Sequence, residues 1–489
     1  MMKLTRLLER LEYEVRQGSD QIEVTELIND SRKVTKGSVF VCISGAVSDG
    51  HDYIEDVAEK GAAAVIVERP VDAPEGLTVI HVDDTRYALA LMSAAYFGYP
   101  AEKLKVIGIT GTKGKTTTTY MVKSILEGVG HKVGLIGTIE ALIGDKSIPA
   151  NNTTPESYTI HQYFAQMVEE GCDCVVMEVS SQGLMLHRTA GILFEIGIFT
   201  NLGEDHIGPN EHKDFEDYKR CKGILFTQCK LGIANVDDQW FEDVFRNATC
   251  KVETFGFSEK ADLRATNVQH IATPGYLGVK YHVSGLMDFD VEIDIPGNFS
   301  VYNSLTAIAV CRHFGVPVEN IQAALKKAKV KGRVEMVKVS DQFTMLIDYA
   351  HNAMSLESLL ETLRDYNPGR IVTIFGCGGN RSKTRRYEMG EVSGRLSDFT
   401  IITSDNPRFE EPQDIINDII VGMKKTDGKY IDICDRKEAI RYAIEHGQPG
   451  DIIVLAGKGH ETYQEIRGVK YDMDDRVLIK EVLEELHVR

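Results

Sequence analysis

A glycine-, lysine- and threonine-rich segment, 110–116 (TGTKGKT), has the residue types of a loop that binds nucleotide phosphates. Glycines let backbone N–H groups turn inward on phosphate oxygens, and the N-terminus of a following helix adds positive potential. Lys115 is suited to neutralise the terminal phosphates, and the Thr116 hydroxyl is suited to bind Mg²⁺. We therefore predict that ATP binds to Thr110, Gly111, Thr112, Lys113, Gly114, Lys115 and Thr116.

The loop departs from the strict pattern G-x-x-x-x-G-K-[ST], whose first glycine would fall on Ile109. Its surroundings still fit a phosphate site. An apolar strand at 104–109 precedes it, and a helix with Val122, Ile125 and Val129 on one face follows it. This order of strand, loop and helix is the context that phosphate binding requires.

Short β-rich apolar runs alternate with helical stretches along almost the whole chain, which predicts an α/β fold with parallel sheets. The stretch from 251 to 297 differs, because apolar and acidic residues alternate at 289–295 and predict an antiparallel strand with one solvated face. Other strands are predicted at 39–43, 63–67, 78–82, 104–109, 133–136, 174–179, 196–200, 343–347, 370–375, 400–403 and 451–455, with helices at 87–97 and 303–314.

The predicted fold class is α/β with three domains. An N-terminal domain would span 1–100 and end at the linker Gly98-Tyr99-Pro100. A central domain at 101–330 would hold the phosphate loop in a parallel sheet with an added antiparallel region. A Rossmann-like α/β domain would span 331–489. The length of 489 residues is too great for one core, which supports this division.

The composition excludes several classes of protein. With 73 acidic and 55 basic residues the formal charge is −18, which argues against nucleic acids or anionic membranes as partners. No apolar run is long enough for a membrane span, and the N-terminus lacks an apolar signal core. The nine cysteines lie mostly in apolar runs, which predicts reduced thiols. We expect a cytoplasmic monomer with small-molecule substrates.

Motifs spread over nearly the whole chain resemble, in order, those of the Mur ligases, the ATP-dependent amide-forming enzymes of peptidoglycan precursor assembly. They are DSR (30–32), NTTPE (152–156), MEVSSQGLMLHR (177–188), TNLGEDH (200–206), YKRCKGILF (218–226), PGNFSVYNSLTA (296–307), DYAHN (348–352), FGCGGNRSKTRR (375–386), SDNPR (404–408) and GKGHETYQ (457–464). The resemblance is greatest to the MurE type, which adds the third amino acid to UDP-MurNAc-L-Ala-D-Glu. It implies a ligase that activates a substrate carboxylate as an acyl phosphate, which the incoming amine then attacks.

The resemblance implies catalytic roles for Lys115, Glu178, His206 and Lys222, with Mg²⁺ held by Thr116, Glu178, His206 and Lys222. Lys222 would act as a carbamate (N6-carboxylysine), and the alternative lysine is Lys219. Glu178 also stands out by itself, since it ends an apolar strand where a carboxylate is costly unless it is paired or coordinated. A capping or ion-pair role for Glu178 and a structural role for His206 stay open.

The same resemblance implies that UDP-MurNAc-dipeptide contacts Ser31, Asn152, Thr153, Thr154, Ser180 and Arg188. Hydroxyls and an arginine suit diphosphate and carboxylate recognition, although Ser31 is equally suited to a turn or a cap. The nucleotide would also contact Asn303, Asp348 and His351. Two positions depart from the family: Gln182 replaces a common His, and Asn352-Ala353 replaces a frequent x-Pro.

The segment SDNPR matches the signature of members that use meso-diaminopimelate, and the implied amino-acid contacts are Arg386, Asp405, Asn406, Pro407, Arg408, Gly457 and Glu461. Meso-diaminopimelate has a carboxylate where lysine has a hydrogen, and Arg408 is suited to grip that carboxylate bidentately. A charge-assisted bond of about 1.5–3 kcal/mol corresponds to roughly 10- to 150-fold discrimination. Glu461 would accept from the distal ammonium, or else be an ordinary acid at a helix N-terminus. The segment 379–387 lacks two acids and a proline that the family often has.

Several alternatives stay open at this stage. The ligase could add lysine, ornithine or another diamino acid. A folylpolyglutamate synthetase-like ligase would share the central and C-terminal plan, but the N-terminal DSR and the SDNPR segment argue against it. A non-catalytic nucleotide sensor is disfavoured by the intact Lys115, Glu178 and Lys222. A motor-type ATPase would release phosphate without an acceptor amine.

Overall fold

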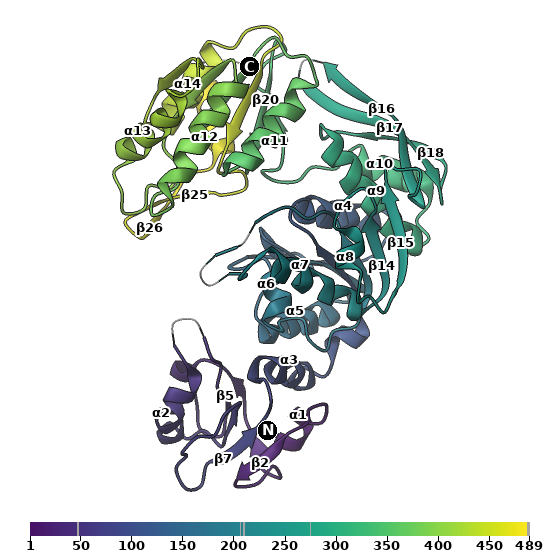
Figure 1. The fold of residues 1–489 in the computed structure, drawn as a ribbon, viewed down its shortest axis with the longest axis vertical. Coiled ribbons are helices and arrows are strands. Elements are labelled where there is room, and N and C mark those ends of the chain that lie inside the picture. Colours follow the sequence, from purple (N-terminus) through teal and green to yellow (C-terminus); the bar gives the residue numbers. More distant parts are fainter. Residues whose placement is uncertain (46–47, 206, 209–210, 274, 487–489) are drawn as a thin grey trace. The chain divides into compact units, whose positions relative to one another are not determined.

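The computed structural model describes residues 1–45, 48–205, 207–208, 211–273 and 275–486. The chain forms two compact units, Met1–Asp262 with Thr306–Val316 and Leu263–Leu305 with Pro317–Arg489 (Figure 1). Both units are α/β, as predicted. The domain boundaries at residues 100 and 330 stay predictions. Among the described residues, no helix combines the length and the apolar character needed to cross a membrane.

A five-stranded sheet, ordered β2-β7-β6-β5-β4, forms the N-terminal part of the first unit. Val39 and Val41 pack into the core that includes α3, whereas Phe40 between them packs with α2, because successive side chains of a strand point to opposite faces. The bounds are β1 Met2–Lys3, α1 Leu4–Leu7, β2 Glu14–Gln17, β3 Glu23–Val24, β4 Leu27–Ile28, β5 Val39–Val41, α2 Ile54–Glu59, β6 Ala64–Val67, β7 Thr78–His81 and α3 Thr85–Tyr96, with 3-10 turns η1 Ser31–Lys33 and η2 Gly50–Tyr53.

A mostly parallel sheet follows, with the strand order β11-β10-β9-β12-β8-β13-β14-β15 within the first unit. In this spatial order, neighbouring strands are parallel along the series β9, β12, β8, β13, β14 and β15. Strands β12, β8 and β13 lie side by side at the centre. The bounds are β8 Lys105–Thr110, α4 Lys115–Glu127, β9 Val133–Ile136, β10 Glu140–Ile143, β11 Lys146–Pro149, α5 Ser157–Glu169, β12 Cys174–Glu178, α6 Ser181–Met185, β13 Phe194–Phe199, α7 Phe215–Gly223, β14 Cys229–Asn235, α8 Phe241–Val244 and β15 Lys251–Gly256, with 3-10 turns η3 Pro100–Lys103 and η4 Ile224–Thr227.

This strand order decides where the first candidate site forms. The carboxyl ends of neighbouring parallel strands meet at one edge of a sheet, which is where open α/β sheets bind ligands. The loop after β8, Glu178 at the end of β12 and Thr200 after β13 therefore come to the same edge.

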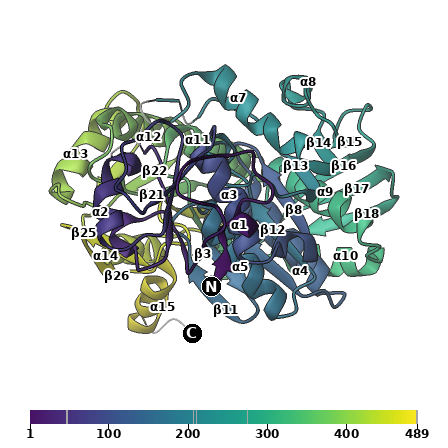
Figure 2. The same ribbon diagram turned by 90° about the horizontal axis from the view of Figure 1, so that it is seen from below.

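Three antiparallel strands and a second parallel sheet build the second unit. Figures 1 and 2 both show β16, β17 and β18 side by side, and the predicted antiparallel strand at 289–295 is confirmed as β18. The second sheet has the order β19-β20-β24-β21-β22-β23 and is parallel from β20 onward. The bounds are β16 Leu263–Thr273, β17 Tyr276–Gly285, β18 Phe289–Ile293, α9 Asn298–His313 (which continues into the first unit), α10 Val318–Leu325, β19 Glu335–Val337, β20 Thr344–Asp348, α11 Ala353–Arg364, β21 Ile371–Phe375, α12 Lys383–Leu396, β22 Phe399–Ile402, α13 Pro412–Met423, β23 Tyr430–Asp432, α14 Arg436–Glu445, β24 Ile452–Ala456, β25 Tyr463–Ile466, β26 Val469–Asp472 and α15 Asp475–Glu485.

The strands of this second sheet are apolar and buried. Residues of β20, β21, β22 and β24 form its core together with α14 and α15. Such continuous apolar runs are expected where a parallel sheet is covered on both faces. The nine cysteines are all free, and seven of them are buried.

Candidate active site

The phosphate loop connects β8 to α4, as the sequence predicts. Thr110 ends the strand and Lys115 begins the helix, while Gly111 and Gly114 between them have φ angles of 147° and 86°. Both angles lie in the region that favours glycine. At Gly111 a side chain is also excluded by space, since a Cβ would lie 1.9 Å from Thr200 Oγ1.

Residues that follow the neighbouring strand β13 hold the loop in place. The Lys113 N–H donates to Asn201 Oδ1 at 2.9 Å, and Asn201 Nδ2 returns a bond to the Lys113 carbonyl at 3.0 Å. The Thr200 hydroxyl donates to the same carbonyl at 2.7 Å. These roles of Thr200 and Asn201 were not predicted from the sequence, although the two residues begin the motif TNLGEDH.

Glu178 is a buried carboxylate at the end of β12, only 1% exposed. Its Oε1 accepts from the Thr116 hydroxyl at 3.0 Å and from the Thr138 N–H at 2.9 Å, and its Oε2 accepts from the Thr138 hydroxyl at 3.0 Å. Among the described residues, its hydrogen-bond donors are all neutral. Because a buried carboxylate is costly without a cation, this donor set fits a Mg²⁺ ligand beside Thr116.

Lys222 is a buried lysine on α7, 2% exposed, and its Nζ donates to the Gly111 carbonyl at 2.9 Å. Burial lowers its pKa well below the ordinary value, and the nearby Lys115 ammonium adds to this shift. Lys219, the alternative lysine, pairs instead with Glu216 and Asp243, at 2.9 Å each. The structure thus separates the two lysines clearly: Lys222 reaches the phosphate loop, and Lys219 makes ion pairs away from it.

Lys115 folds back on the loop, with its Nζ donating to the carbonyls of Gly111 at 2.9 Å and Thr112 at 3.1 Å. Lys115, Thr116, Glu178 and Lys222 therefore gather around one loop. His206, the remaining predicted ligand, lies outside the described residues.

Three of the residues predicted for the UDP-sugar peptide form a connected group. The Thr154 hydroxyl donates to the Glu178 carbonyl at 3.0 Å and accepts from the Ser180 N–H at 2.9 Å. Ser180 caps α6, since its hydroxyl accepts from the Gly183 N–H at 3.0 Å. Arg188 donates to the Thr154 carbonyl at 2.9 Å, so this group is continuous with Glu178.

The other predicted contacts of that substrate are placed nearby or elsewhere in the first unit. The Thr153 hydroxyl lies 3.1 Å from that of Thr138, which binds Glu178. Asn152 lines a hollow of about 210 Å³ beside β10, β11 and α5. Ser31 begins the turn η1, whose cap is Asp30, so the capping role left open for Ser31 belongs to its neighbour.

In the second unit, Asp348 ends β20 and is buried. Its two carboxylate oxygens accept from the N–H groups of Val334 and Ala350, both at 2.8 Å, and burial raises its pKa. His351 Nδ1 donates to the Tyr349 carbonyl at 2.9 Å. Asn352 caps α11 through the Ser355 N–H, so the residue that departs from the family pattern begins the helix.

A fully buried lysine, Lys458, organises the predicted amino-acid contacts. Its Nζ lies 3.3 Å from Asn406 Oδ1, 3.2 Å from Glu461 Oε2 and 3.8 Å from Asp405 Oδ1. Asn406 Nδ2 also donates to Glu461 Oε2 at 2.8 Å. Burial raises the pKa of Asp405, and the Lys458 charge opposes that shift. Glu461 does not begin a helix, which removes the alternative role suggested for it. Lys458 was not among the residues predicted from the sequence, although it lies inside the motif GKGHETYQ.

Arg408 lies beside this group in a left-handed backbone conformation, φ 52°. Its N–H and carbonyl bond to Glu465 and Arg467 of the hairpin β25–β26, at 2.9 and 2.7 Å. The guanidinium donates to the Gly379 carbonyl at 2.8 Å and to Glu465 Oε2 at 3.2 Å. Such strained positions are common at binding sites.

The remaining predicted contacts have structural partners. Arg386 is buried and donates to both oxygens of Glu410, at 2.7 and 2.8 Å, and to Asp418 at 2.9 Å. Gly457 has φ 108°, and a Cβ there would lie 3.0 Å from Asp405 Oδ2. Asn303 is buried on α9, and Pro407 is buried between Asn406 and Arg408.

Comparison with known families matches three parts of the chain. Residues 109–311 match the Mur ligase middle domain, residues 332–459 match the Mur ligase, glutamate ligase domain, and residues 23–97 match the Mur ligase family, catalytic domain.

The chain is 44% identical to a protein of Clostridium acetobutylicum named UDP-N-acetylmuramoyl-L-alanyl-D-glutamate--2,6-diaminopimelate ligase 1, over 99% of this chain and 100% of that protein. A ligase of the same name without the numeral, from Clostridium perfringens, is 43% identical over 99% and 100%. A solved structure titled as that ligase has a TM-score of 0.74 at 26% identity and covers all of both chains. The chain belongs to the Mur ligase family and is an ATP-dependent ligase.

Proposed function

We propose that this ligase adds meso-diaminopimelate to UDP-MurNAc-L-Ala-D-Glu through an acyl phosphate, in the synthesis of peptidoglycan precursor. The names of relatives at 44% and 43% identity over the whole chain support this substrate pair. The single observation that carries it is a phosphate loop with a buried Glu178 and a buried Lys222 against it. Such a site is suited to move a phosphoryl group onto a carboxylate.

The loop residues bind and orient ATP, and Lys115 neutralises developing charge on the transferred phosphoryl group. Thr116, Glu178 and Lys222 would hold Mg²⁺, together with His206 as the family resemblance implies. The ion, when bound, offsets negative charge on the phosphates. The protein contributes mainly by fixing these groups before the reaction, since phosphoryl transfer depends on positioning and electrostatics.

Lys222 acts in this proposal as a carbamate. Its neutral amine attacks carbon dioxide through the nitrogen lone pair. The C–N bond forms, one C=O π bond breaks to leave a carboxylate oxygen, and one amine proton passes to water. The low pKa that burial causes supports this step, because only the unprotonated amine is a nucleophile. The product carries a carboxylate-like group on a long side chain.

Arg408 recognises the distal carboxylate of meso-diaminopimelate, and Glu461 accepts from its distal ammonium. Lysine lacks the distal carboxylate that Arg408 would bind, and loss of this charge-assisted bond corresponds to roughly 10- to 150-fold in affinity. The grouping of Asn406, Glu461 and Lys458 supports a pre-formed polar pocket beside Arg408.

The test is phosphate release from ATP in the presence of UDP-MurNAc-L-Ala-D-Glu, with meso-diaminopimelate, lysine, ornithine or no amine. Release with meso-diaminopimelate alone is expected. Release with lysine or ornithine instead would keep the ligase and overturn the role of Arg408. Phosphate release without any amine would indicate a motor-type ATPase. No phosphate release with any amine, although ATP binds, would favour a non-catalytic nucleotide sensor.

A further inference from the structure

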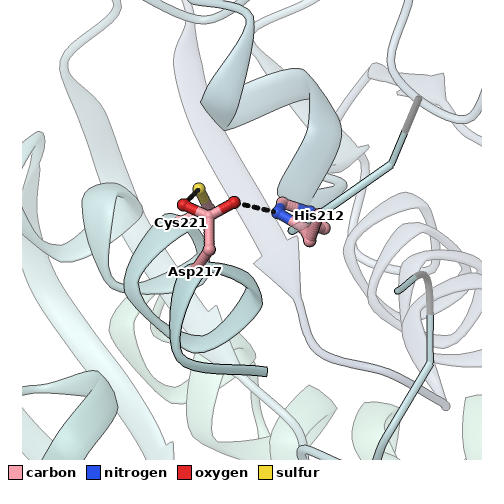
Figure 3. A group of neighbouring side chains, drawn as sticks. All are labelled: His212, Asp217 and Cys221. Atoms are coloured by element: carbon pink, nitrogen blue, oxygen red, sulfur yellow. Dashed lines mark hydrogen bonds and ion pairs between the residues drawn. The ribbon is translucent and has the colours of Figure 1, made fainter. Parts of the chain in front are cut away.

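A buried hydrogen-bond chain links helices α6 and α7 of the first unit. Ser181 Oγ lies 2.9 Å from His212 Nε2, and His212 Nδ1 lies 3.0 Å from Asp217 Oδ2. Figure 3 shows His212 and Asp217 facing each other beside Cys221. With the Asp217 carboxylate accepting from His212 Nδ1–H, the other ring nitrogen, Nε2, accepts a hydrogen bond from the Ser181 hydroxyl. One imidazole therefore joins two helices.

The order of hydroxyl, imidazole and carboxylate is also that of a hydrolytic triad. Burial argues against such a role here, because Ser181 is 3% exposed and His212 is 1% exposed. A serine nucleophile must be reached by its substrate, and this hydroxyl is covered. This hydrogen-bond chain is therefore suited to hold α6 and α7 together rather than to attack a substrate.

A metal site is a second interpretation, since His212, Asp217 and Cys221 present ligand atoms within 4.8 Å of one another. The Arg220 guanidinium already lies beside the ligand atoms of Asp217 and Cys221. Arg220 Nη2 lies 2.7 Å from Asp217 Oδ1 and 3.4 Å from Cys221 Sγ. This guanidinium balances the Asp217 charge, and the hydrogen-bond chain needs no added ion.

The serine end of the chain lies next to Glu178. Glu178, at the end of β12, is followed by Val179, Ser180 and Ser181, where α6 begins. Thr154 holds the first part of this turn through the Glu178 carbonyl and the Ser180 N–H. The His212 bond to Ser181 holds the next part. The backbone turn that follows Glu178 is thus held by two anchors.

The aspartate end of the chain lies on α7, the helix that carries Lys222. Tyr218, one residue after Asp217, places its hydroxyl 3.0 Å from Thr112 Oγ1. One turn further, Lys222 donates to the Gly111 carbonyl at 2.9 Å. The His212 ring also packs edge-on against Tyr218, with ring centroids 5.2 Å apart. The orientation of α7 relative to the phosphate loop therefore depends on the His212 imidazole as well.

We propose that His212 is a positioning residue for the ligase reaction: by joining Ser181 to Asp217, it fixes the strand end that carries Glu178 relative to the helix that carries Lys222. This inference rests on the proposed function, because Glu178 and Lys222 are its metal-binding pair. In this proposal His212 acts through Ser181 and Asp217 and not by direct contact with substrate or ion.

The experiment uses three variants of the full chain that break the hydrogen-bond chain in different places. Ser181→Ala removes one hydroxyl, His212→Asn keeps a donor toward Asp217 only, and His212→Gln keeps an acceptor toward Ser181 only. We measure kcat, KM for each substrate and the Mg²⁺ concentration that gives half the maximal rate, together with Tm. We expect kcat to fall about 10- to 100-fold and the Mg²⁺ requirement to rise about 10-fold, as for removal of an outer-shell partner.

The KM for the amino acid should change less than twofold, since its predicted contacts belong to the second unit. The Ser181→Ala and His212→Asn effects should not add in the double variant, because each breaks the same chain. Arg246→Ala is the matched control: it removes an exposed arginine that pairs with an aspartate outside the hydrogen-bond chain, Asp243, and should leave kcat and the Mg²⁺ requirement unchanged.

A lower Tm with an unchanged Mg²⁺ requirement would overturn the inference and leave His212 a purely structural residue. Unchanged kcat in the Ser181→Ala variant, which loses only one hydroxyl and should fold, would overturn it as well. If the unaltered enzyme releases no phosphate with any amine, the proposed function fails instead. The two failures are therefore distinguishable.

Discussion

The phosphate region of the first unit and the amino-acid region of the second are both built where parallel strands end, yet they treat charge in opposite ways. Around the phosphate loop, Glu178 accepts only from neutral groups and Lys222 donates to a backbone carbonyl, among the described residues. Around the SDNPR segment, three charged side chains face charged partners. Glu461 meets Lys458, Arg408 meets Glu465, and Arg386 meets Glu410.

This difference shows how each region is prepared for its ligand. Uncompensated buried charge is costly for folding and is kept where a ligand of opposite charge completes the site. Paired charges instead fix the shape of a pocket, and a ligand has to share or displace the partners. Loss of a charge should therefore harm activity most in the first region and stability most in the second.

The largest expected effect is that of Glu178→Gln. Gln keeps the shape of the side chain but removes the charge that the proposed metal site needs, so kcat should fall about 1000-fold, the scale of a lost electrostatic contact to a transition state. Stability should be unchanged or higher, because a buried unpaired carboxylate is removed. Phosphate-release kinetics and thermal unfolding measure both. A drop in Tm with retained kcat would reverse the comparison.

Lys458→Met should have the opposite pattern. Removing this buried cation leaves Glu461 and Asp405 without their partner, a change that costs about 3–5 kcal/mol when a buried pair is broken. Urea unfolding measures the loss, and KM for the amino acid should rise. Lys470→Met on the exposed strand β26 is the matched control and should leave stability near the original value. Equal stability of the two variants would contradict the role of Lys458.

Arg408→Lys should have a smaller effect that is confined to the amino acid. Lysine keeps the charge but loses the bidentate geometry, so kcat/KM for meso-diaminopimelate should fall about 10- to 100-fold. The KM for ATP should not change. Lysine as acceptor should gain relative to meso-diaminopimelate. Competition between the two amines measures this ratio, and an unchanged ratio would show that Arg408 does not read the distal carboxylate.

The smallest effect concerns pH and Glu410. Hydrogen bonds from Arg386 lower the pKa of this carboxyl to about 2, from an ordinary 4.5. A lowered folded-state pKa adds stability above pH 4.5 that is lost as the pH falls toward 2. Glu410→Gln should therefore be less stable near pH 6, by about 1 kcal/mol or less because solvent screens the pair. The gap should close as the pH falls toward 2. Glu411→Gln, which makes the same change at an exposed neighbour, is the control variant.

The contrast also explains what the sequence could reveal. The phosphate loop was predictable because its chemistry is carried by backbone N–H groups, and the required glycines and flanking strand are visible in the sequence. Glu178 was predictable because a carboxylate is rare at the end of an apolar strand. Lys222 could be separated from Lys219 only by family spacing, and the structure separates them by their partners: Lys222 donates to the Gly111 carbonyl, whereas Lys219 pairs with acidic side chains.

The partners of these residues could not be predicted. Thr138 binds Glu178 from forty residues away, and Glu465 binds Arg408 from fifty-seven residues away. Such pairs depend on tertiary contacts that no local pattern specifies. Arg386 shows the consequence: the family motif implies a substrate contact, while the structure gives its guanidinium two acidic partners. His212 was missed because a lone histidine in a polar segment carries no signal by itself.

The bond from Lys222 to the Gly111 carbonyl has a consequence for the state of that lysine. An ammonium group has three hydrogens to place, a neutral amine has two, and a carbamate nitrogen has one. Among the described residues, the Gly111 oxygen is the hydrogen-bond acceptor of Lys222 Nζ. A free ammonium here would also face the Tyr218 ring, whose centroid lies 4.5 Å from Nζ, whereas a carbamate nitrogen would need no acceptor beyond Gly111. Carboxylation would keep the bond to the loop and relieve the nitrogen of its surplus donors.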